Sequence, residues 1–290
     1  MIEIHSDDFC ITPGASRQIL NCINNGCVNG ISIMPDSEYF AECLDILKAE
    51  CGKDIFISVH LDLITGKAVS GKSVITDRDG FFNITYIKYI LIFLIPLYRR
   101  KYREAVKKEL SAQLDLCLPY LDRKKIRIDS HRHIHMVPGI FSVVMELIKE
   151  KGLGLEYMRI TKDRPGYFKG LPAFQHFSIK GVIKSLLLRF FSDIDLCRFH
   201  RELKGHTADF AAILFSGMMT EKNLRLILEN KRHSKNLAGR DLEIMVHPYF
   251  VSDPGEIQRI HDTEDKGYVA SDMRRKEIDA VLSERIKTLT

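Results

Sequence analysis

Four residues that can bind a metal or move a proton lie close together near the middle of the chain. The stretch DSHRHIH at 129–135 places one aspartate and three histidines, Asp129, His131, His133 and His135, within seven residues. It directly follows KIRI, a short apolar alternation that is typical of a strand. Imidazole and carboxylate groups are common metal ligands and common general acids and bases. The stretch therefore predicts a chemical site at a strand end.

Three other short apolar runs also end in ionisable residues. MIEIHSDD ends at Asp7 and Asp8, DIFISVH ends at His60, and LEIMVH ends at His247. Alternating with such runs are segments whose apolar residues recur every three or four positions, as in helices; these are residues 15–25, 37–49, 103–116 and 138–151. The alternation indicates an α/β protein with a mostly parallel sheet, and 290 residues suit a closed or nearly closed barrel. Because barrel strands end on one face, these ionisable residues are expected to meet in one pocket.

Each of these residues also has a purely structural explanation. A single histidine at a strand end is more often a solvated or hydrogen-bonded residue than a ligand. Asp7 and Asp8 could cap the helix that follows them, although Thr12 or Ser16 would cap it equally well. The histidines of 129–135 could belong to a polar loop, whereas in an extended chain they would share one face and line a pocket.

The composition argues against several classes of protein. A net charge of +5, from 43 basic and 38 acidic residues, is too small to favour nucleic-acid binding. Seven cysteines without C-x-x-C spacing indicate neither a disulfide framework nor a zinc ribbon. The N-terminus MIEIHSDDF has no basic and no long apolar region of a secretion signal. Because no linker-like segment interrupts the chain, residues 1–290 are expected to form a single domain in the reducing cytoplasm.

Six motifs occur along the chain in a specific order. They are HSDDF at 5–9, SVHLDLITGKAV at 58–69, ELSAQLD at 109–115, DSHRHIHMVPGI at 129–140, YMRI at 157–160 and EIMVHPYF at 243–250. Each motif alone is weak, but together and in this order they are specific. The sequence resembles the YdjC-like carbohydrate deacetylase family (ChbG-type chitooligosaccharide deacetylases), and the resemblance spans the chain.

This resemblance implies a distorted TIM-like (β/α) barrel and a hydrolase that removes the N-acetyl group from an acetylated amino sugar or short oligosaccharide. It also implies one divalent metal ion, held by Asp8, His60 and His131, with Asp7 as the neighbouring base. Two imidazoles and one carboxylate leave coordination positions open for water and substrate. Mg or Zn is expected first, and Mn or Co is compatible with the same mixed ligands.

The remaining strand-end residues are expected to complete this site. His247 is the expected acid for the departing amine, or else it steers the base. Asp129 is expected to orient one of the ligating histidines. Arg159 is expected to contact the substrate or the oxyanion, with a surface ion pair as the alternative. His133 and His135 are expected to line the pocket or to support the ligands.

Two positions depart from the family pattern. The family has Phe-Gly after its aspartate pair, whereas this chain has Phe9 and Cys10, and glycine permits backbone conformations that other residues resist. An inert buried thiol is expected at this position rather than a ligand. Arg132 replaces a histidine of the family run, which leaves the predicted ligand His131 in place. Neighbouring aspartates on a straight strand would point to opposite faces, so the chain is expected to turn there.

Two segments, residues 84–108 and 179–200, combine apolar runs with basic residues and are expected to be helical insertions. The apolar run at 84–98 contains Lys88 and Pro96 and is short for a membrane-spanning helix. The segments are expected to cover the barrel or to pack against a second subunit in a homodimer. Peripheral contact with a membrane surface is the alternative, and it would suit a lipid-linked acetylated sugar.

Other functions fit the same residues. A metal-dependent phosphoesterase would use His133, His135 and His247 as additional ligands for several ions, whereas one ion fits deacetylation. A sugar-binding protein would keep the barrel without turnover, and Cys10 leaves this possibility open. Non-haem iron oxygenases also use two histidines and a carboxylate, but normally on an all-β scaffold, which ranks them last.

Overall fold

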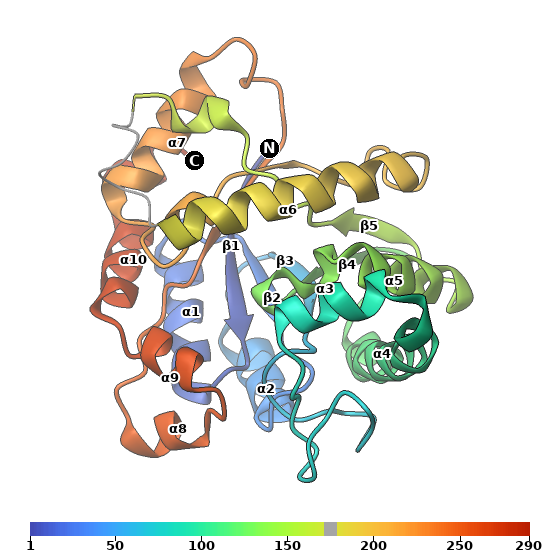
Figure 1. The fold of residues 1–290 in the computed structure, drawn as a ribbon. Helices are drawn as coiled ribbons and strands as arrows, with labels where there is room; N and C mark the ends of the chain where they lie inside the picture. The colour runs from blue at the N-terminus through green and yellow to red at the C-terminus, as the bar shows by residue number, and fades with distance from the viewer. Residues whose placement is uncertain (171–178) are drawn as a thin grey trace.

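The computed structural model describes residues 1–170 and 179–290, and it is built around one parallel sheet (Figure 1). Seven strands pair in the order β5-β4-β3-β2-β1-β7-β6, and every neighbouring pair is parallel. The strands are β1 (Ile2–Phe9), β2 (Gly30–Ile33), β3 (Phe56–Leu61), β4 (Ile126–Ser130), β5 (Leu155–Met158), β6 (Asp209–Phe210) and β7 (Leu242–Val246). The predicted α/β fold with a parallel sheet is confirmed.

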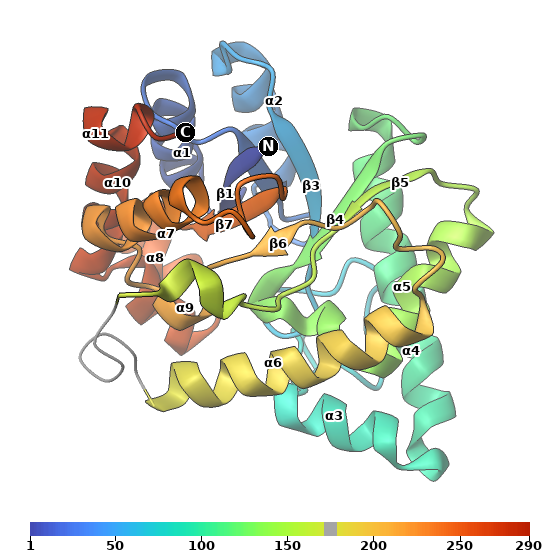
Figure 2. The same ribbon diagram turned by 90° about the horizontal axis from the view of Figure 1, so that it is seen from above.

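The sheet curls into a nearly closed barrel, seen from above in Figure 2. Backbone contacts link the two edge strands β5 and β6 and the segments beside them. The amide of Met158 donates to the carbonyl of His206 at 2.8 Å, and Asp163 forms a parallel bridge with Phe210. The chain therefore forms the expected distorted barrel, with fewer strands than a regular TIM barrel.

Helices surround the curled sheet. They are α1 (Pro13–Asn25), α2 (Phe40–Glu50), α3 (Tyr86–Leu94), α4 (Pro96–Cys117), α5 (Pro138–Glu150), α6 (Ile179–Arg198), α7 (Glu221–His233), α8 (Pro254–Arg259), α9 (Thr263–Val269), α10 (Asp272–Leu282) and α11 (Glu284–Lys287). The apolar spacing predicted α1, α2, α5 and the second half of α4. The insertion expected at 84–108 contains α3 and the start of α4, and the one at 179–200 contains α6.

The neighbouring strands β1 and β7 carry charged side chains into the barrel. They pair in register from Ile2 with Leu242 to Ser6 with Val246. Both strands are buried almost throughout, as expected when helices cover a parallel sheet. In β1 every second residue from Glu3 to Asp7 is nevertheless polar, and β7 contributes Glu243; Glu3, His5, Asp7 and Glu243 are all buried. The barrel interior is therefore ionic, which positions charged groups beneath the strand ends.

The chain turns sharply at the ends of β1 and β4. At the end of β1, Asp8 has a φ of 64° and Cys10 a φ of 84°, and the pairing with β2 shifts register there. Just after β4, Arg132 and His133 have φ values of 50° and 63°. Among the described residues, these four are the non-glycine residues with positive φ, a conformation that concentrates at functional sites. The turn expected after β1 is present.

Substitutions of Cys10 test whether this turn stores strain, because Cys10 has a positive φ, a conformation that glycine adopts freely. Its thiol is fully buried and contacts Cys43. Alanine at position 10 removes the thiol and keeps the strain, whereas glycine removes both. We expect Cys10→Gly to exceed Cys10→Ala in free energy of unfolding by about 1 kcal/mol, measured by urea denaturation. A glycine variant no more stable than the alanine variant would show that the turn is unstrained.

Candidate metal centre

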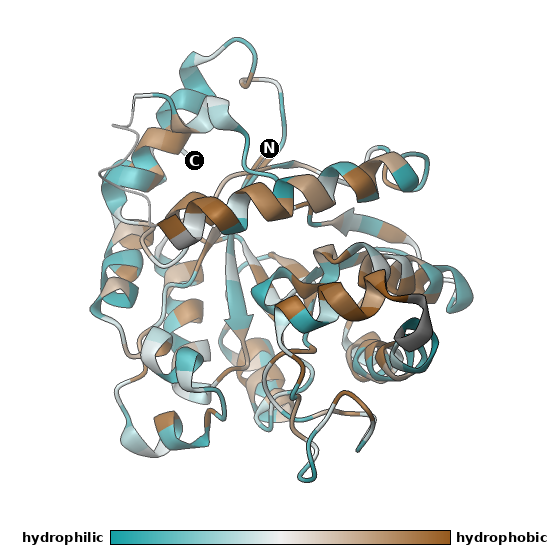
Figure 3. Ribbon diagram, viewed as in Figure 1, coloured by the Kyte–Doolittle hydropathy of each residue, from teal (hydrophilic) through white to brown (hydrophobic). Residues whose placement is uncertain are grey.

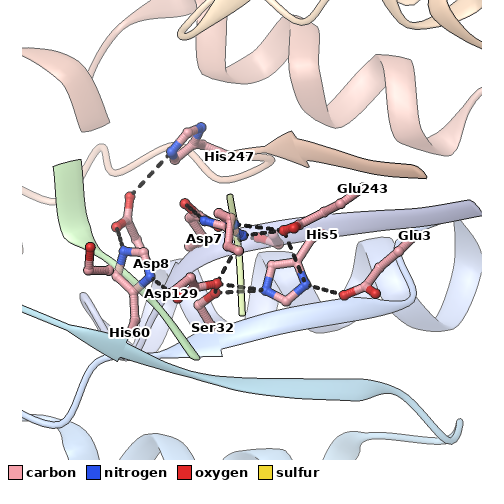
Figure 4. A network of polar contacts seen from close by, with 12 residues as sticks. Glu3, His5, Asp7, Asp8, Ser32, His60, Asp129, Glu243 and His247 are labelled. Atoms are coloured by element: carbon pink, nitrogen blue, oxygen red, sulfur yellow. Dashed lines mark hydrogen bonds and ion pairs between the residues drawn. The ribbon is translucent and has the colours of Figure 1, made fainter. Parts of the chain in front are cut away.

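The carboxylate of Asp8 and the imidazoles of His60 and His131 converge at the C-terminal edge of the sheet. Oδ1 of Asp8 lies 2.9 Å from Nδ1 of His131 and 3.3 Å from Nε2 of His60. Figure 4 shows the approach of Asp8 and His60. One ligand atom from each of the three residues lies within 4.8 Å of the other two, and all three side chains are buried. These are the residues predicted as metal ligands.

Each of the three side chains comes from the end of a different strand. His60 is the penultimate residue of β3, and His131 is the first residue after β4. Asp8 lies at the end of β1, where its positive φ redirects the chain. Because parallel strands end at a common edge, three residues far apart in sequence meet there.

Carboxylates and imidazoles at this centre shift one another's pKa values. Burial alone would raise the pKa of Asp8, but His131 and His60 hold it well below its usual value. Burial alone would lower the pKa of both imidazoles. Asp129 nevertheless raises the pKa of His60 to about 10, and Asp265 with Asp8 raises that of His131 well above its usual value. Without a metal, both imidazoles therefore carry an extra proton at neutral pH.

The arrangement of donors fits a divalent metal ion. Oδ1 of Asp129 lies 2.7 Å from Nδ1 of His60, which leaves Nε2 of that ring facing Asp8. A carboxylate on the far nitrogen is the usual support for a metal-binding histidine. Two nitrogens and one carboxylate oxygen would leave coordination positions open.

Two further groups with metal-like spacing occur among the described residues, but arginines neutralise them. They are Glu3 with His5 and Glu243, and His5 with Asp7 and Asp129. Arg127 pairs with Glu3 at 2.5 Å, and Arg159 pairs with Asp7 at 2.8 Å. A metal ion at either place would compete with a buried guanidinium that already satisfies the carboxylates.

Arg159 lies fully buried in the centre of the barrel and holds Asp7 with both terminal nitrogens. The two N–O distances are 2.8 Å. The same guanidinium contacts Asp129 at 2.9 Å and Glu243 at 2.8 Å. The alternative prediction, that Arg159 forms an ion pair at the surface, is therefore wrong, because the side chain is fully buried. Asp7 lines a cavity beside the three predicted ligands, and Arg159 does not line it. Arg159 can therefore affect this cavity only by holding Asp7.

His247 follows β7 and faces the second oxygen of Asp8 (Figure 4). Its Nε2 lies 3.8 Å from Oδ2 of Asp8, and the hydroxyl of Tyr268 lies 3.1 Å from its Nδ1. The hydroxyl of Tyr249 donates to the same Asp8 oxygen at 2.6 Å. Burial lowers the pKa of His247, and the nearby Asp8 offsets this only in part. The imidazole is therefore mainly neutral at pH 7.

The three histidines of the DSHRHIH stretch do not share one face, because the chain is not extended there. A short 3-10 helix (His131–Met136) with two left-handed residues replaces the extended run. His135 points into the protein, where its Nε2 lies 2.9 Å from the carbonyl oxygen of Arg159. His133 lines the cavity with the expected ligands, and its Nδ1 has no hydrogen-bond partner in the described part of the chain.

These side chains surround a cavity of about 220 Å³. The sequence reasoning missed several residues of its wall; they are Lys184, Ser216, Glu264, Asp265 and Tyr268. They lie on α6, on α9 and in a connecting segment, so no strand-end pattern marks them. Burial lowers the pKa of Lys184 to about 8. Asp265 lies 3.3 Å from Nε2 of His131. The only sequence signals were the basic residues of the 179–200 segment and the acidic run around Asp265.

Metal binding should release protons, because both imidazoles are protonated in the metal-free site and a ligand needs a free lone pair. We expect the affinity to fall about tenfold per pH unit for each proton released as the pH is lowered. Titration calorimetry in buffers of different ionisation enthalpy measures this release directly.

His131→Ala should abolish metal binding, because it removes one of the predicted ligands. His233→Ala, which changes an exposed histidine of α7, should preserve metal binding. A binding heat that does not depend on the buffer would contradict the protonation described here.

Comparisons with known proteins agree with this fold. A family model described as YdjC-like protein matches residues 1–290. A chitooligosaccharide deacetylase of Escherichia fergusonii is 24% identical over 251 residues, which cover 87% of this chain and 82% of that protein. A crystal structure from Enterococcus faecalis V583, of a candidate cellobiose-phosphate cleavage protein, has a TM-score of 0.67 and 20% identity, covering 99% of this chain and 92% of that one. Because the family model covers every residue, this chain belongs to the family of YdjC-like proteins.

Proposed function

We propose that this chain is a metal-dependent carbohydrate deacetylase that hydrolyses the N-acetyl group of an acetylated amino sugar or short oligosaccharide. The observation that carries the proposal is the convergence of Asp8, His60 and His131 beside Asp7 and His247 at one cavity. Amide hydrolysis needs an activated water, a polarised carbonyl and a proton for the departing amine. Similarity to a chitooligosaccharide deacetylase supports this substrate class.

Asp8, His60 and His131 would hold one divalent ion, with Mg or Zn expected first and Mn or Co as alternatives. Such an ion, when bound, lowers the pKa of water and polarises the carbonyl of the amide. Asp129 fixes the ring of His60, and Tyr249 fixes the second oxygen of Asp8. The donors are therefore oriented by the protein itself.

Asp7 is the proposed base, and His247 is the proposed acid. Arg159 binds both oxygens of Asp7 and so fixes the carboxylate at the cavity wall. Asp7 takes a proton from the attacking water, and His247 donates a proton to the nitrogen as the C–N bond breaks. Because His247 is mainly neutral before the reaction, it must be protonated first. The proton that Asp7 takes from the water is passed to His247 before the C–N bond breaks, so both side chains return to their starting states. Overall, one proton passes from water to the amine.

A second cavity beside the first offers room for a longer sugar. Its volume is about 560 Å³, and the two cavities share Asp265. Tyr39 and Phe81 contribute aromatic surface to its wall, and Phe81 stacks on His261 with ring centroids 4.0 Å apart. Ligand sites commonly combine such aromatic walls with a few placed polar groups. We assign the acetylated residue to the smaller cavity and any further sugar residues to the larger one.

The alternative functions have less support. A phosphoesterase with several ions would need His133, His135 and His247 as further ligands. His135 instead contacts the backbone of Arg159, and the described residues hold one metal-like group without an arginine. A sugar-binding protein without turnover would share the geometry, so acetate release separates it from the enzyme.

Acetate release from N-acetylglucosamine oligomers and other acetylated amino sugars tests the proposed function. Metal-stripped protein should be inactive until Mg, Mn, Co or Zn is restored. Asp7→Asn should keep the metal and lose about 100-fold or more in kcat, whereas His131→Ala should lose the metal. The matched control, Asp272→Asn, changes an exposed carboxylate and should keep the full rate. Full activity of Asp7→Asn, or no acetate from any acetylated sugar by metal-loaded protein, would contradict the proposal.

The leaving group tests the role of His247. An amine leaves only after protonation, whereas p-nitrophenolate leaves without it. His247→Gln should therefore lower the rate on N-acetylated sugars by about 100-fold and the rate on p-nitrophenyl acetate much less. Equal losses on the two substrates would mean that His247 orients the site and does not supply the proton.

A further inference from the structure

Helix α3 has apolar side chains on two opposite faces. On the outer face, Ile87, Leu91, Leu94 and the C-cap residue Ile95 are between 44% and 71% exposed. Their spacing of three and four residues places them along one side of the helix. The other face, which includes Phe93, is buried against the protein. The helix therefore covers the barrel with one face and presents a second apolar face outward.

Helix α6 repeats this pattern. Its exposed apolar residues are Ile179, Val182, Ile183, Leu186 and Phe190, while Leu188 and Phe191 are buried. We call the exposed apolar residues of α3, its C-cap and α6 the apolar face. It holds nine of the twelve large apolar side chains that are exposed in the described residues. Such a concentration differs from the scattered apolar residues of an ordinary surface.

The two helices lie on the same side of the molecule. Figure 1 shows α6 and α3 in front of the sheet, and Figure 2 shows both at one margin of the fold. Figure 3 shows apolar residues along both helices. The apolar face is therefore available to a single partner with a broad surface.

Within the two segments that carry the apolar face, all charged residues are basic. Residues 80–103 and 179–192 contain no aspartate or glutamate. Lys88, Arg99 and Arg100 are exposed on or just after α3. A second copy of this face would bring basic groups together without acidic partners. Anionic lipid headgroups would instead neutralise them, and the hydrocarbon beneath would cover the apolar side chains.

We propose that the apolar face binds the surface of an anionic lipid bilayer, with α3 and α6 lying in the headgroup region. Interfacial helices have this combination of one apolar side and flanking basic residues. In the part of the chain that the structure describes, no helix has the length and apolar character needed to cross a membrane. All seven cysteines are free thiols, which suits a reducing compartment, where the inner membrane leaflet is anionic.

Both helices also reach the candidate site. Lys184, on α6, lines the metal-site cavity, while its neighbour Ile183 belongs to the apolar face. The hydroxyl of Tyr86, on α3, lies 3.5 Å from the carbonyl oxygen of His133 in the cavity wall. The metal-site cavity thus lies next to the apolar face. Together with the proposed deacetylation, on which this last step rests, the placement points to an acetylated amino sugar carried by a lipid.

Vesicle flotation without any substrate tests the docking independently of catalysis. The protein should float with phosphatidylcholine vesicles that contain about one third phosphatidylglycerol, and not with pure phosphatidylcholine. High salt should release it, since headgroup attraction is screened. Leu94→Ser combined with Leu186→Ser should weaken the binding at least about tenfold. Leu116→Ser, which changes an exposed leucine outside the apolar face, should leave it unchanged.

Thermal unfolding of the variants should match that of the unchanged protein, because the altered side chains are exposed. Absence of flotation with anionic vesicles would overturn the proposal, as would equal binding by the double variant. A dimer that dissociates on the double substitution, without vesicle binding, would identify a second copy of the chain as the occupant and would also overturn it. Vesicle binding without acetate release would retain the docking and reject the proposed function.

Discussion

The buried guanidinium of Arg159 is the interaction on which the rest of the site depends. Carboxylates from three different strands, Asp7, Asp129 and Glu243, contact it in the centre of the barrel. Breaking a buried ion pair by removing one partner destabilises a protein by about 3–5 kcal/mol, because the other charge is left unpaired. These carboxylates could not gather away from water without the arginine. The barrel consequently has an ionic interior, whereas most protein cores are apolar.

Asp129 links the barrel interior to the metal centre, because it contacts both Arg159 and His60. Burial alone would raise its pKa, but Arg159 and His60 lower it far below its usual value, so the group stays a carboxylate. One of its oxygens faces Nδ1 of His60, and the other accepts a hydrogen bond from Ser32. The imidazole is thereby fixed with Nε2 toward Asp8. The geometry of a predicted ligand thus depends on an arginine that never reaches the cavity.

Local patterns in the sequence predicted those parts of the site that local structure determines. His60 and Asp8 could be found because each ends a strand-like run, and parallel strands end together. The backbone after β4 could not be predicted, since left-handed residues such as His133 are maintained by tertiary contacts. Lys184 and Asp265 were missed for a related reason. They enter the cavity from helices, so only the assembled fold shows that they belong to the site.

Asp7 and Asp8 show how one backbone turn gives two neighbouring carboxylates different chemistry. On a straight strand they would face opposite sides of the sheet. The positive φ of Asp8 lets both line the same cavity, yet each meets a different cation. The partner of Asp7 is Arg159, whose guanidinium does not lose its proton in a protein. The partners of Asp8 are imidazoles, which can give up theirs. An entering metal ion can therefore replace the protons beside Asp8, whereas the arginine keeps Asp7 in place as a fixed carboxylate.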